Sequence, residues 1–290
     1  MAHVVVCGTA VLDHRVWVTH WPPARGRTPA TAYVEDLGGP GAVAAVAVAR
    51  LGGSACLVGP RGADAAGERV AAFLRAHGVA IEFLRPFAGA RTPVSAIVIV
   101  PGGERFIFPY AGEGLPDDPG WAPLAALHGA DAVLVDSHFP RAGRALAAAA
   151  HARGLPVVLD LDSDTEAAWS LAGAATHAIA DEELAARAGG VDAVLARLAA
   201  HGIWGAVTLG PAGVRHRGGH VPGFPVSVHD STGAGDVFHG AFALALAERR
   251  APDGALVFAS AAAALRCETG RVPERRAVEE FLAAASRRGD

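Results

Sequence analysis

A regular alternation of short apolar runs with alanine-rich segments is the feature that most constrains the fold of this chain. The apolar runs are rich in valine and leucine, which is typical of strands buried on both faces of a parallel sheet. They lie at Val4–Cys7, Ala55–Val58, Ala132–Val135, Pro156–Leu159 and Ala206–Leu209. The alternation predicts an α/β fold with a doubly wound, mostly parallel sheet and right-handed crossovers.

The segments between and after these runs are expected to be helices that cover the sheet. Their composition and spacing place them at Gly41–Leu51, Gly67–His77, Arg141–Arg153, Asp181–Ala188, Val191–His201, Gly235–Arg249, Asp253–Cys267 and Arg276–Ser286. A chain of 290 residues and 29.4 kDa can bury a large core as one unit. Because no low-complexity linker interrupts it, we expect a single domain over residues 1–290.

Two segments break the alternation and predict a small β layer over the sheet. Residues 14–36 alternate apolar and polar side chains, and residues 92–110 read as a hairpin. The hairpin strands are expected at Val94–Val100 and Arg105–Phe108, around a turn that includes Gly103. Because loops of this length in compact domains are usually functional, we interpret the two segments as a lid, with ordinary surface loops as the alternative.

Charge and hydropathy exclude several classes of function. The formal net charge is −4 and no basic run occurs, so nucleic acid is not expected as a partner. No apolar stretch approaches the roughly 20 residues of a membrane span, and the first strand starts too early for a signal peptide. Cys7, Cys56 and Cys267 fit no metal or redox pattern, and His216 and His220 read as a surface loop. A cytoplasmic location is expected.

The stretch Asp230-Ser-Thr-Gly-Ala-Gly-Asp236 carries the strongest functional signal. Two carboxylates bracket a glycine-rich turn that leads into an apolar run. Such a loop leaves the N–H groups of Gly233, Ala234 and Gly235 free to bind an anion. Asp236, in the first helical turn, is then placed as a general base for phosphoryl transfer. A loop whose two acids merely cap a helix is the alternative.

The sequence contains no lysine, asparagine or glutamine. P-loop enzymes, protein kinases and Schiff-base enzymes need a lysine and are therefore excluded. If this chain transfers phosphate, arginines, backbone amides and a metal must carry the charge. Asp160 follows a core strand, at the sheet edge where ligands bind in open α/β sheets, and is expected to face the site.

The order Asp-Ser-Thr-Gly-Ala-Gly-Asp-Val-Phe-His-Gly-Ala-Phe resembles the C-terminal signature of the PfkB, or ribokinase-like, sugar kinases. Gly38-Gly39 before a helix and Thr208–Gly213 match further parts of that family in the right order. The resemblance implies a ribokinase-like domain with a small β lid, and a sugar kinase that uses ATP and Mg²⁺. The segments around residues 39–53 and Leu265-Arg266-Cys267 are most similar to the ketohexokinase-like, sulfofructose-kinase branch.

On the sugar side, the resemblance implies that Asp13 accepts hydrogen bonds from sugar hydroxyls, although a strand-end aspartate is also a turn former. Gly38 and Gly39 would let the backbone approach the sugar and let the lid close. Val43 stands where the family usually has a sugar-contacting asparagine.

The same branch is expected to hold a sulfonate with a lysine, an asparagine and an arginine. This chain offers Arg27, Pro109 and His138 at those positions. Arg27 could pair with an anionic tail, whereas Pro109 cannot donate a hydrogen bond and His138 is only partly charged near neutral pH. A neutral ketose and an acidic sugar both remain open as substrates.

On the nucleotide side, the resemblance implies that Thr208, Gly210 and Gly213 wrap a phosphate or ribose, with a plain hairpin turn as the alternative. Gly233 and Gly235 would serve the nucleotide as well as the anion hole. Ser260 stands where the family often has a polar contact to adenine.

Two ion sites are implied. Glu183 keeps the spacing of the family's magnesium-ordering glutamate, with Asp181 and Glu182 as alternatives, although acids at a helix start also suit the helix dipole. The loop at residues 269–273, with Asp230 and Thr232, could form a monovalent-cation site, which makes K⁺ a possible activator.

These features together predict an ATP-dependent kinase of a ketose or related carbohydrate, with Asp236 as general base. A nucleoside kinase of the same fold and a non-catalytic sugar- or nucleotide-binding regulator are the alternatives. By analogy with the family, a homodimer through the lid is expected.

Overall fold

The computed structural model describes residues 1–23, 26–102 and 104–288. Its main sheet, over those residues, consists of β1 (His3–Cys7), β4 (Ser54–Gly62), β5 (Leu84–Phe87), β8 (Ala132–Val135), β9 (Val157–Leu161), β10 (His177–Asp181), β11 (Trp204–Thr208), β12 (Val214–His216) and β13 (Gly219–Val221). The strand order is β13-β12-β11-β10-β9-β8-β1-β4-β5. Strands from β11 to β5 pair in parallel, whereas β12 and β13 form an antiparallel end. The sheet is therefore mostly parallel, as predicted.

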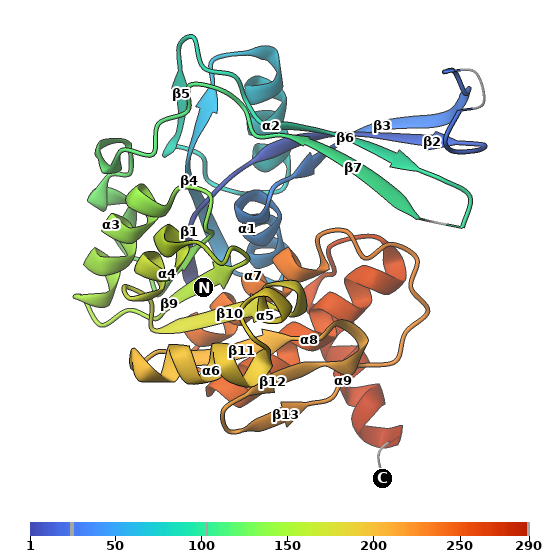
Figure 1. Ribbon diagram of the computed structural model, residues 1–290. Helices are drawn as coiled ribbons and strands as arrows, with labels where there is room; N and C mark the ends of the chain where they lie inside the picture. The colour runs from blue at the N-terminus through green and yellow to red at the C-terminus, as the bar shows by residue number, and fades with distance from the viewer. Residues whose placement is uncertain (24–25, 103, 289–290) are drawn as a thin grey trace.

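Helices cover both faces of this sheet, because successive strand side chains point to opposite sides. In β1, Val4 and Val6 join one hydrophobic cluster, whereas Val5 and Cys7 join the other. The first cluster includes side chains of α1 (Pro40–Arg50), α2 (Ala65–Ala76), α7 (Ala234–Ala247), α8 (Pro252–Thr269) and α9 (Arg275–Arg288). The second cluster includes side chains of α3 (Pro140–His151), α4 (Glu166–Ala172), α5 (Glu182–Arg187) and α6 (Val191–Ala200). The layers are visible in Figure 1. No described helix is long and apolar enough to cross a membrane.

A second, four-stranded sheet projects from this core (Figure 1). Its strands are β2 (Val11–Val18), β3 (Ala30–Gly38), β6 (Val94–Ile99) and β7 (Arg105–Tyr110), in the order β3-β2-β6-β7. The two segments predicted as a β layer therefore lie in one sheet, with β2 and β6 pairing in parallel at its centre. The expected turn residue Gly103 lies outside the described residues.

Several elements differ from the sequence prediction. The strand β10 has the sequence His-Ala-Ile-Ala-Asp, which contains one β-branched residue and was therefore not recognised. The 7-residue helix α4 was also missed. The prediction of a surface loop for His216 is wrong: its ring is buried and stacks on Trp204, with centroids 5.7 Å apart, in the short β12–β13 hairpin. His220 in the same hairpin is exposed, as expected.

Candidate functional site

A cavity of about 330 Å³ lies where the second sheet meets the core. Seven residues that the sequence analysis singled out line it: Asp13, Gly38, Gly39, Val43, Thr232, Gly233 and Asp236. They come from β2, the junction between β3 and α1, and the start of α7, which lies far away in the sequence. The fold thus assembles the predicted sugar side and the predicted anion hole around one space.

The start of α7 has the geometry of an anion-binding turn. Gly233 adopts a left-handed conformation with φ 71°, which only glycine enters without cost, and the helix begins at Ala234. The N–H of Ala234 donates to Ser231 O at 3.2 Å and is already engaged within the loop. Among the described residues, the N–H groups of Gly233 and Gly235 find no such partner. Two of the three predicted amides are therefore free to bind an anion.

Asp236 lies beside this turn and is partly buried. A β-carbon added to Gly233 would lie 3.5 Å from Asp236 Oδ2, so the carboxylate points back towards the loop. Burial, followed by the negative charge of Asp160, raises the pKa of Asp236 to about 7. A carboxyl group with that pKa can accept a proton from an alcohol and still be ionised near neutral pH.

A buried histidine and a second buried aspartate stand behind Asp236. The Nδ1 of His239 lies 2.7 Å from the carbonyl oxygen of Gly235, which can only accept, so Nδ1 carries the proton. Its Nε2 faces Asp160 Oδ1 at 3.5 Å. Burial raises the pKa of Asp160 well above its ordinary value, and the charges of Asp162 and Asp136 add to this. Asp160 does not line the cavity itself, and its contact with His239 is what links it to the start of α7.

Asp13 and the Gly38-Gly39 pair are packed against one another. A β-carbon on Gly38 would lie 2.4 Å from Asp13 Oδ1, so this contact requires glycine. Gly39 has φ 90°, and a β-carbon there would lie 2.8 Å from Thr9 O. Asp13 is 5% exposed, and burial raises its pKa even though the charge of Arg15 lowers it. This carboxylate is placed for hydrogen bonds from a ligand in the cavity.

A further buried carboxylate, Asp136, fixes three chain segments at this end of the sheet. Its Oδ2 accepts hydrogen bonds from Thr9 N at 2.7 Å and Gly41 N at 3.2 Å. Its Oδ1 accepts one from His138 N at 3.1 Å. The ends of β1 and β8 and the start of α1 are therefore held together by one side chain, which the sequence analysis did not identify.

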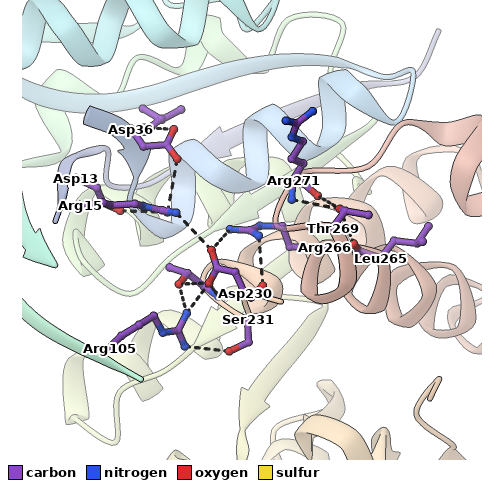
Figure 2. A network of polar contacts seen from close by, with 12 residues as sticks. Asp13, Arg15, Asp36, Arg105, Asp230, Ser231, Leu265, Arg266, Thr269 and Arg271 are labelled. Atoms are coloured by element: carbon purple, nitrogen blue, oxygen red, sulfur yellow. Dashed lines mark hydrogen bonds and ion pairs between the residues drawn. The ribbon is translucent and has the colours of Figure 1, made fainter. Parts of the chain in front are cut away.

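The other end of the Asp230–Asp236 motif is surrounded by arginines, as Figure 2 shows. Arg105 Nη1 lies 2.9 Å from Asp230 Oδ1 and also contacts Thr232 Oγ1. Arg15 and Arg266 reach Asp230 Oδ2 at 3.4 and 3.3 Å. Burial raises the pKa of Asp230, but hydrogen bonds from Thr232 and the charges of Arg266 and Arg15 outweigh it, and the net shift is downward.

None of these three arginines was predicted as a site residue. Arg15 comes from β2, Arg105 from β7 and Arg266 from α8, so their meeting depends on the tertiary fold. Arg15 also lies 3.6 Å from Asp36 Oδ2 and 3.9 Å from Asp13 Oδ2. The only sequence signal was indirect: a chain without lysine must use arginine wherever it needs a fixed cation.

The structure does not bring two of the predicted sugar contacts to the cavity. Arg27 is exposed at the far end of the β2–β3 hairpin, roughly 17 Å of strand beyond Asp13. His138 follows β8 and does not line the cavity. Burial lowers the pKa of His138, but the adjacent Asp136 and the charge of Asp162 raise it to about 9. A pKa of about 9 favours the cationic form of His138 at neutral pH over the partly charged form expected from its ordinary pKa.

Of the predicted nucleotide residues, Gly233 lines that cavity, whereas Thr208, Gly210 and Gly213 lie at the carboxyl end of β11 and Ser260 lies on α8. Gly213 has φ 94°, and a β-carbon there would lie 2.1 Å from Val221 O, so glycine is required for the β12–β13 hairpin to pack. Gly210 has φ 53° and no neighbour within reach of an added β-carbon. Thr208 Oγ1 donates to Ala180 O at 3.3 Å. The hydroxyl of Ser260 is buried and makes no hydrogen bond with the described residues.

The three acids proposed for magnesium differ in position. Asp181 accepts a hydrogen bond from Leu184 N at 2.6 Å and caps α5. It pairs across the sheet with Thr208. Glu182 and Glu183 are exposed, and Glu183 lies 3.9 Å from Arg187. Within the described ranges no three acidic, histidine or cysteine side chains converge as a metal cage. Magnesium bound mainly through substrate phosphates and water, with one or two carboxylates nearby, fits this donor set.

Comparison with known proteins gives one consistent result. Residues 1–272 match the model of the pfkB family of carbohydrate kinases. The ribokinase of Bacillus subtilis is 30% identical over 97% of this chain and 100% of its own length. A crystal structure of a candidate ribokinase from Agrobacterium tumefaciens has 32% identity and a TM-score of 0.91, and covers 99% of both chains. An Arabidopsis thaliana ribokinase, solved with ribose and ATP, has 27% identity and a TM-score of 0.85 over 97% of this chain and 99% of its own.

The family match and the ribokinase-like fold define a sugar-phosphorylating enzyme. The chain belongs to the pfkB family of carbohydrate kinases, phosphotransferases with an alcohol group as acceptor. The family and fold expected from the C-terminal signature are confirmed. The ketohexokinase-like branch is not, because the relatives above are ribokinases, and that finer assignment stays a prediction.

Proposed function

We propose that this protein transfers the γ-phosphoryl group of ATP to a hydroxyl of a neutral sugar, with Asp236 as the general base. The observation that carries the proposal is the position of Asp236 in the cavity, beside the free amides of the α7 turn and with a pKa of about 7. At that pKa the carboxylate takes the hydroxyl proton as the oxygen attacks the phosphorus, and retains it when the sugar phosphate leaves.

The transferred phosphoryl group would be stabilised by the backbone at the start of α7. The free N–H groups of Gly233 and Gly235 point where negative charge develops, and the positive end of the α7 dipole adds to them. Ala234 supports this turn by its bond to Ser231 O rather than by binding the anion directly. Magnesium, when bound, would neutralise charge on the ATP phosphates, with Asp181 near the nucleotide residues as the acid best placed to orient its water.

ATP is the nucleotide we infer, because the similar Arabidopsis ribokinase was solved with ribose and ATP. In this chain Thr208, Gly210 and Gly213 would border the phosphates and ribose. The unpartnered hydroxyl of Ser260 would face the base. Glycine at position 210 keeps the loop free of side chains where the nucleotide has to approach.

The sugar side favours a neutral substrate over an acidic one. Asp13 and Asp36 line the cavity together with the apolar wall of Val43. Carboxylates accept hydrogen bonds from sugar hydroxyls, and they repel a substrate carboxylate or sulfonate. Arg15, on the same side, already pairs with Asp13, Asp36 and Asp230, while Arg50, Arg266 and Arg271 also line the cavity. We therefore place a neutral ketose or pentose first among the candidates.

The four-stranded sheet would act as a lid over the sugar, and its exposed apolar side chains would form part of a dimer interface. Tyr33, Val34, Ile107, Phe108 and Tyr110 are large apolar residues of β3 and β7 that are exposed in the single chain. These residues lie on β3 and β7, the two edge strands of the sheet, and exposed apolar groups of this size are typical of protein interfaces. A molar mass of about 59 kDa in light scattering, twice the 29.4 kDa of the chain, is expected.

Measuring ADP formation with ribose, fructose, other ketoses, their acidic derivatives and a set of nucleosides tests the proposal. We expect turnover with one neutral sugar, and loss of that turnover in Asp236→Asn while ATP still binds. Turnover with a nucleoside alone would replace the sugar kinase by a nucleoside kinase. Calorimetric binding of a sugar without turnover of any compound would identify a non-catalytic binding protein.

A further inference from the structure

Arg266 is a buried arginine attached to the loop that bears the anion hole. It is 5% exposed and belongs to α8. Its Nη1 donates to the carbonyl oxygen of Asp230, and its Nη2 to Asp230 Oδ2, both at 3.3 Å. One guanidinium group therefore binds the backbone and the side chain of the same residue. No step of the phosphoryl transfer described above uses it.

These two oxygens belong to the monovalent-cation site expected from the sequence, together with Thr232 and the loop at residues 269–273. A potassium ion requires several oxygen ligands without positive charges between them, and here a planar cation already contacts both. Arg15 and Arg105 bring two more positive charges to the same carboxylate. An added ion would be repelled by three guanidinium groups, so the predicted K⁺ site does not fit the residues present.

We propose that the Arg266 guanidinium replaces the monovalent cation, so that the kinase carries a fixed positive charge beneath its anion-hole loop and needs no K⁺. The charge holds Asp230, whose Oδ1 accepts bonds from the N–H and hydroxyl of Thr232 at 2.9 and 2.7 Å. Thr232 precedes Gly233, so the contact fixes the turn that presents the free amides. Arg266 is thus a positioning residue for the proposed phosphoryl transfer, on which this inference rests.

Arg266 is suited to this role in a way that Arg15 and Arg105 are not. It extends from a helix of the core, whereas Arg15 and Arg105 belong to the four-stranded sheet, which would move as a lid. Asp230 N and His229 N both donate to Cys267 O, at 3.0 and 2.8 Å, so the loop is tied to α8 directly beside Arg266. The positive charge and the loop therefore stay together whether the lid is open or closed.

The test compares Arg266→Met, a neutral side chain of similar length, with Arg266→Lys, which keeps the charge. Arg276→Ala serves as the matched control, because Arg276 lies on the exposed side of α9 and, among the described residues, pairs with Glu280 alone. Thermal unfolding is measured in KCl and in choline chloride at the same ionic strength of about 0.1 M. An ion that binds only the folded protein raises Tm, so this measurement needs no enzymatic activity.

We expect the wild type, Arg266→Lys and Arg276→Ala to unfold at the same temperature in both salts. Arg266→Met should show a higher Tm in KCl, because removing the guanidinium frees the two oxygens of Asp230. In turnover, the wild type should be unaffected by K⁺, whereas Arg266→Met should lose about tenfold in kcat in choline chloride, the scale of one lost charge-assisted hydrogen bond. KCl should restore part of that loss.

Three results would overturn the proposal: a K⁺-specific rise in the wild-type Tm, several-fold activation of the wild type by K⁺, or an Arg266→Met variant with full kcat in choline chloride. Arg266→Lys keeps the test decisive if Arg266→Met does not fold, since a lysine variant that requires K⁺ also contradicts it. A wild type that phosphorylates nothing while its Tm ignores K⁺ would remove the proposed function and leave the cation replacement standing.

Discussion

Asp230 and Asp236 are six residues apart in one loop, yet their surroundings give them opposite properties. Asp230 contacts three guanidinium groups and the Thr232 hydroxyl, and its pKa falls below the ordinary value. Asp236 is partly buried near other carboxyl groups, and its pKa rises to about 7. The first is kept ionised and rigid, and the second is poised to gain a proton. The comparison separates the structural acid of the motif from the reactive one.

The largest expected effects come from removing each carboxylate in turn. Asp236→Asn should lower kcat by roughly 10²–10⁴-fold, the usual contribution of a general base. It should be at least as stable as the wild type at pH 8. Because the pKa of Asp236 is raised in the folded protein, its protonated carboxyl group contributes stability at low pH, and this contribution is lost as the pH rises from about 4 through 7. Above pH 7 the ionised carboxylate therefore destabilises the folded protein.

Asp230→Asn should instead lower the stability of the folded protein. It leaves three guanidinium groups without their shared partner, two of them with side chains 12% exposed or less. We expect a loss of about 2 kcal/mol in the free energy of unfolding, less than for a fully buried pair because Arg105 remains solvated. Urea unfolding of both variants at pH 8 makes the measurement. Equal destabilisation of the two would mean that their environments do not differ as described.

A smaller effect is expected from Asp160, the buried acid behind Asp236. With Asp236 as general base, kcat/KM should fall on the acid side with an apparent pKa near 7. Asp160→Asn removes the charge that, after burial, contributes most to this shift. The acid limb should therefore move to lower pH while ATP affinity stays unchanged.

A role of Asp160 in packing alone would lower kcat at every pH and leave the limb where it is. His239→Gln offers a matched control for the Asp160–His239 pair, because glutamine can still donate a hydrogen bond to Gly235 O but has no titrating group. An unchanged profile in Asp160→Asn would show that Asp160 does not set the pKa of Asp236.

The sequence predicted the residues around Asp236 more completely than the residues that surround Asp230. Gly233 and Asp236 act through local geometry, a left-handed turn and a first helical turn, which a short contiguous motif encodes. The partners of Asp230 lie at positions 15, 105 and 266, and nothing distinguishes them among the 25 arginines until the fold is known. The same reasoning explains why the strong apolar strands were predicted and β10, with its single isoleucine, was missed.

The smallest expected effect concerns the arginine that links the four-stranded sheet to this loop. Arg105 contacts Asp230, Ser231 Oγ at 2.9 Å and Thr232, and its side chain is 26% exposed. Arg105→Met should raise the KM for the sugar about two- to fivefold, because a partly solvated ion pair contributes up to about 1 kcal/mol. The difference from wild type should shrink in about 0.5 M salt, which screens that pair. Arg27→Ala, at the other end of the same sheet and away from the cavity, should leave KM unchanged; a larger effect there than at Arg105 would place the sugar contact at the hairpin tip instead.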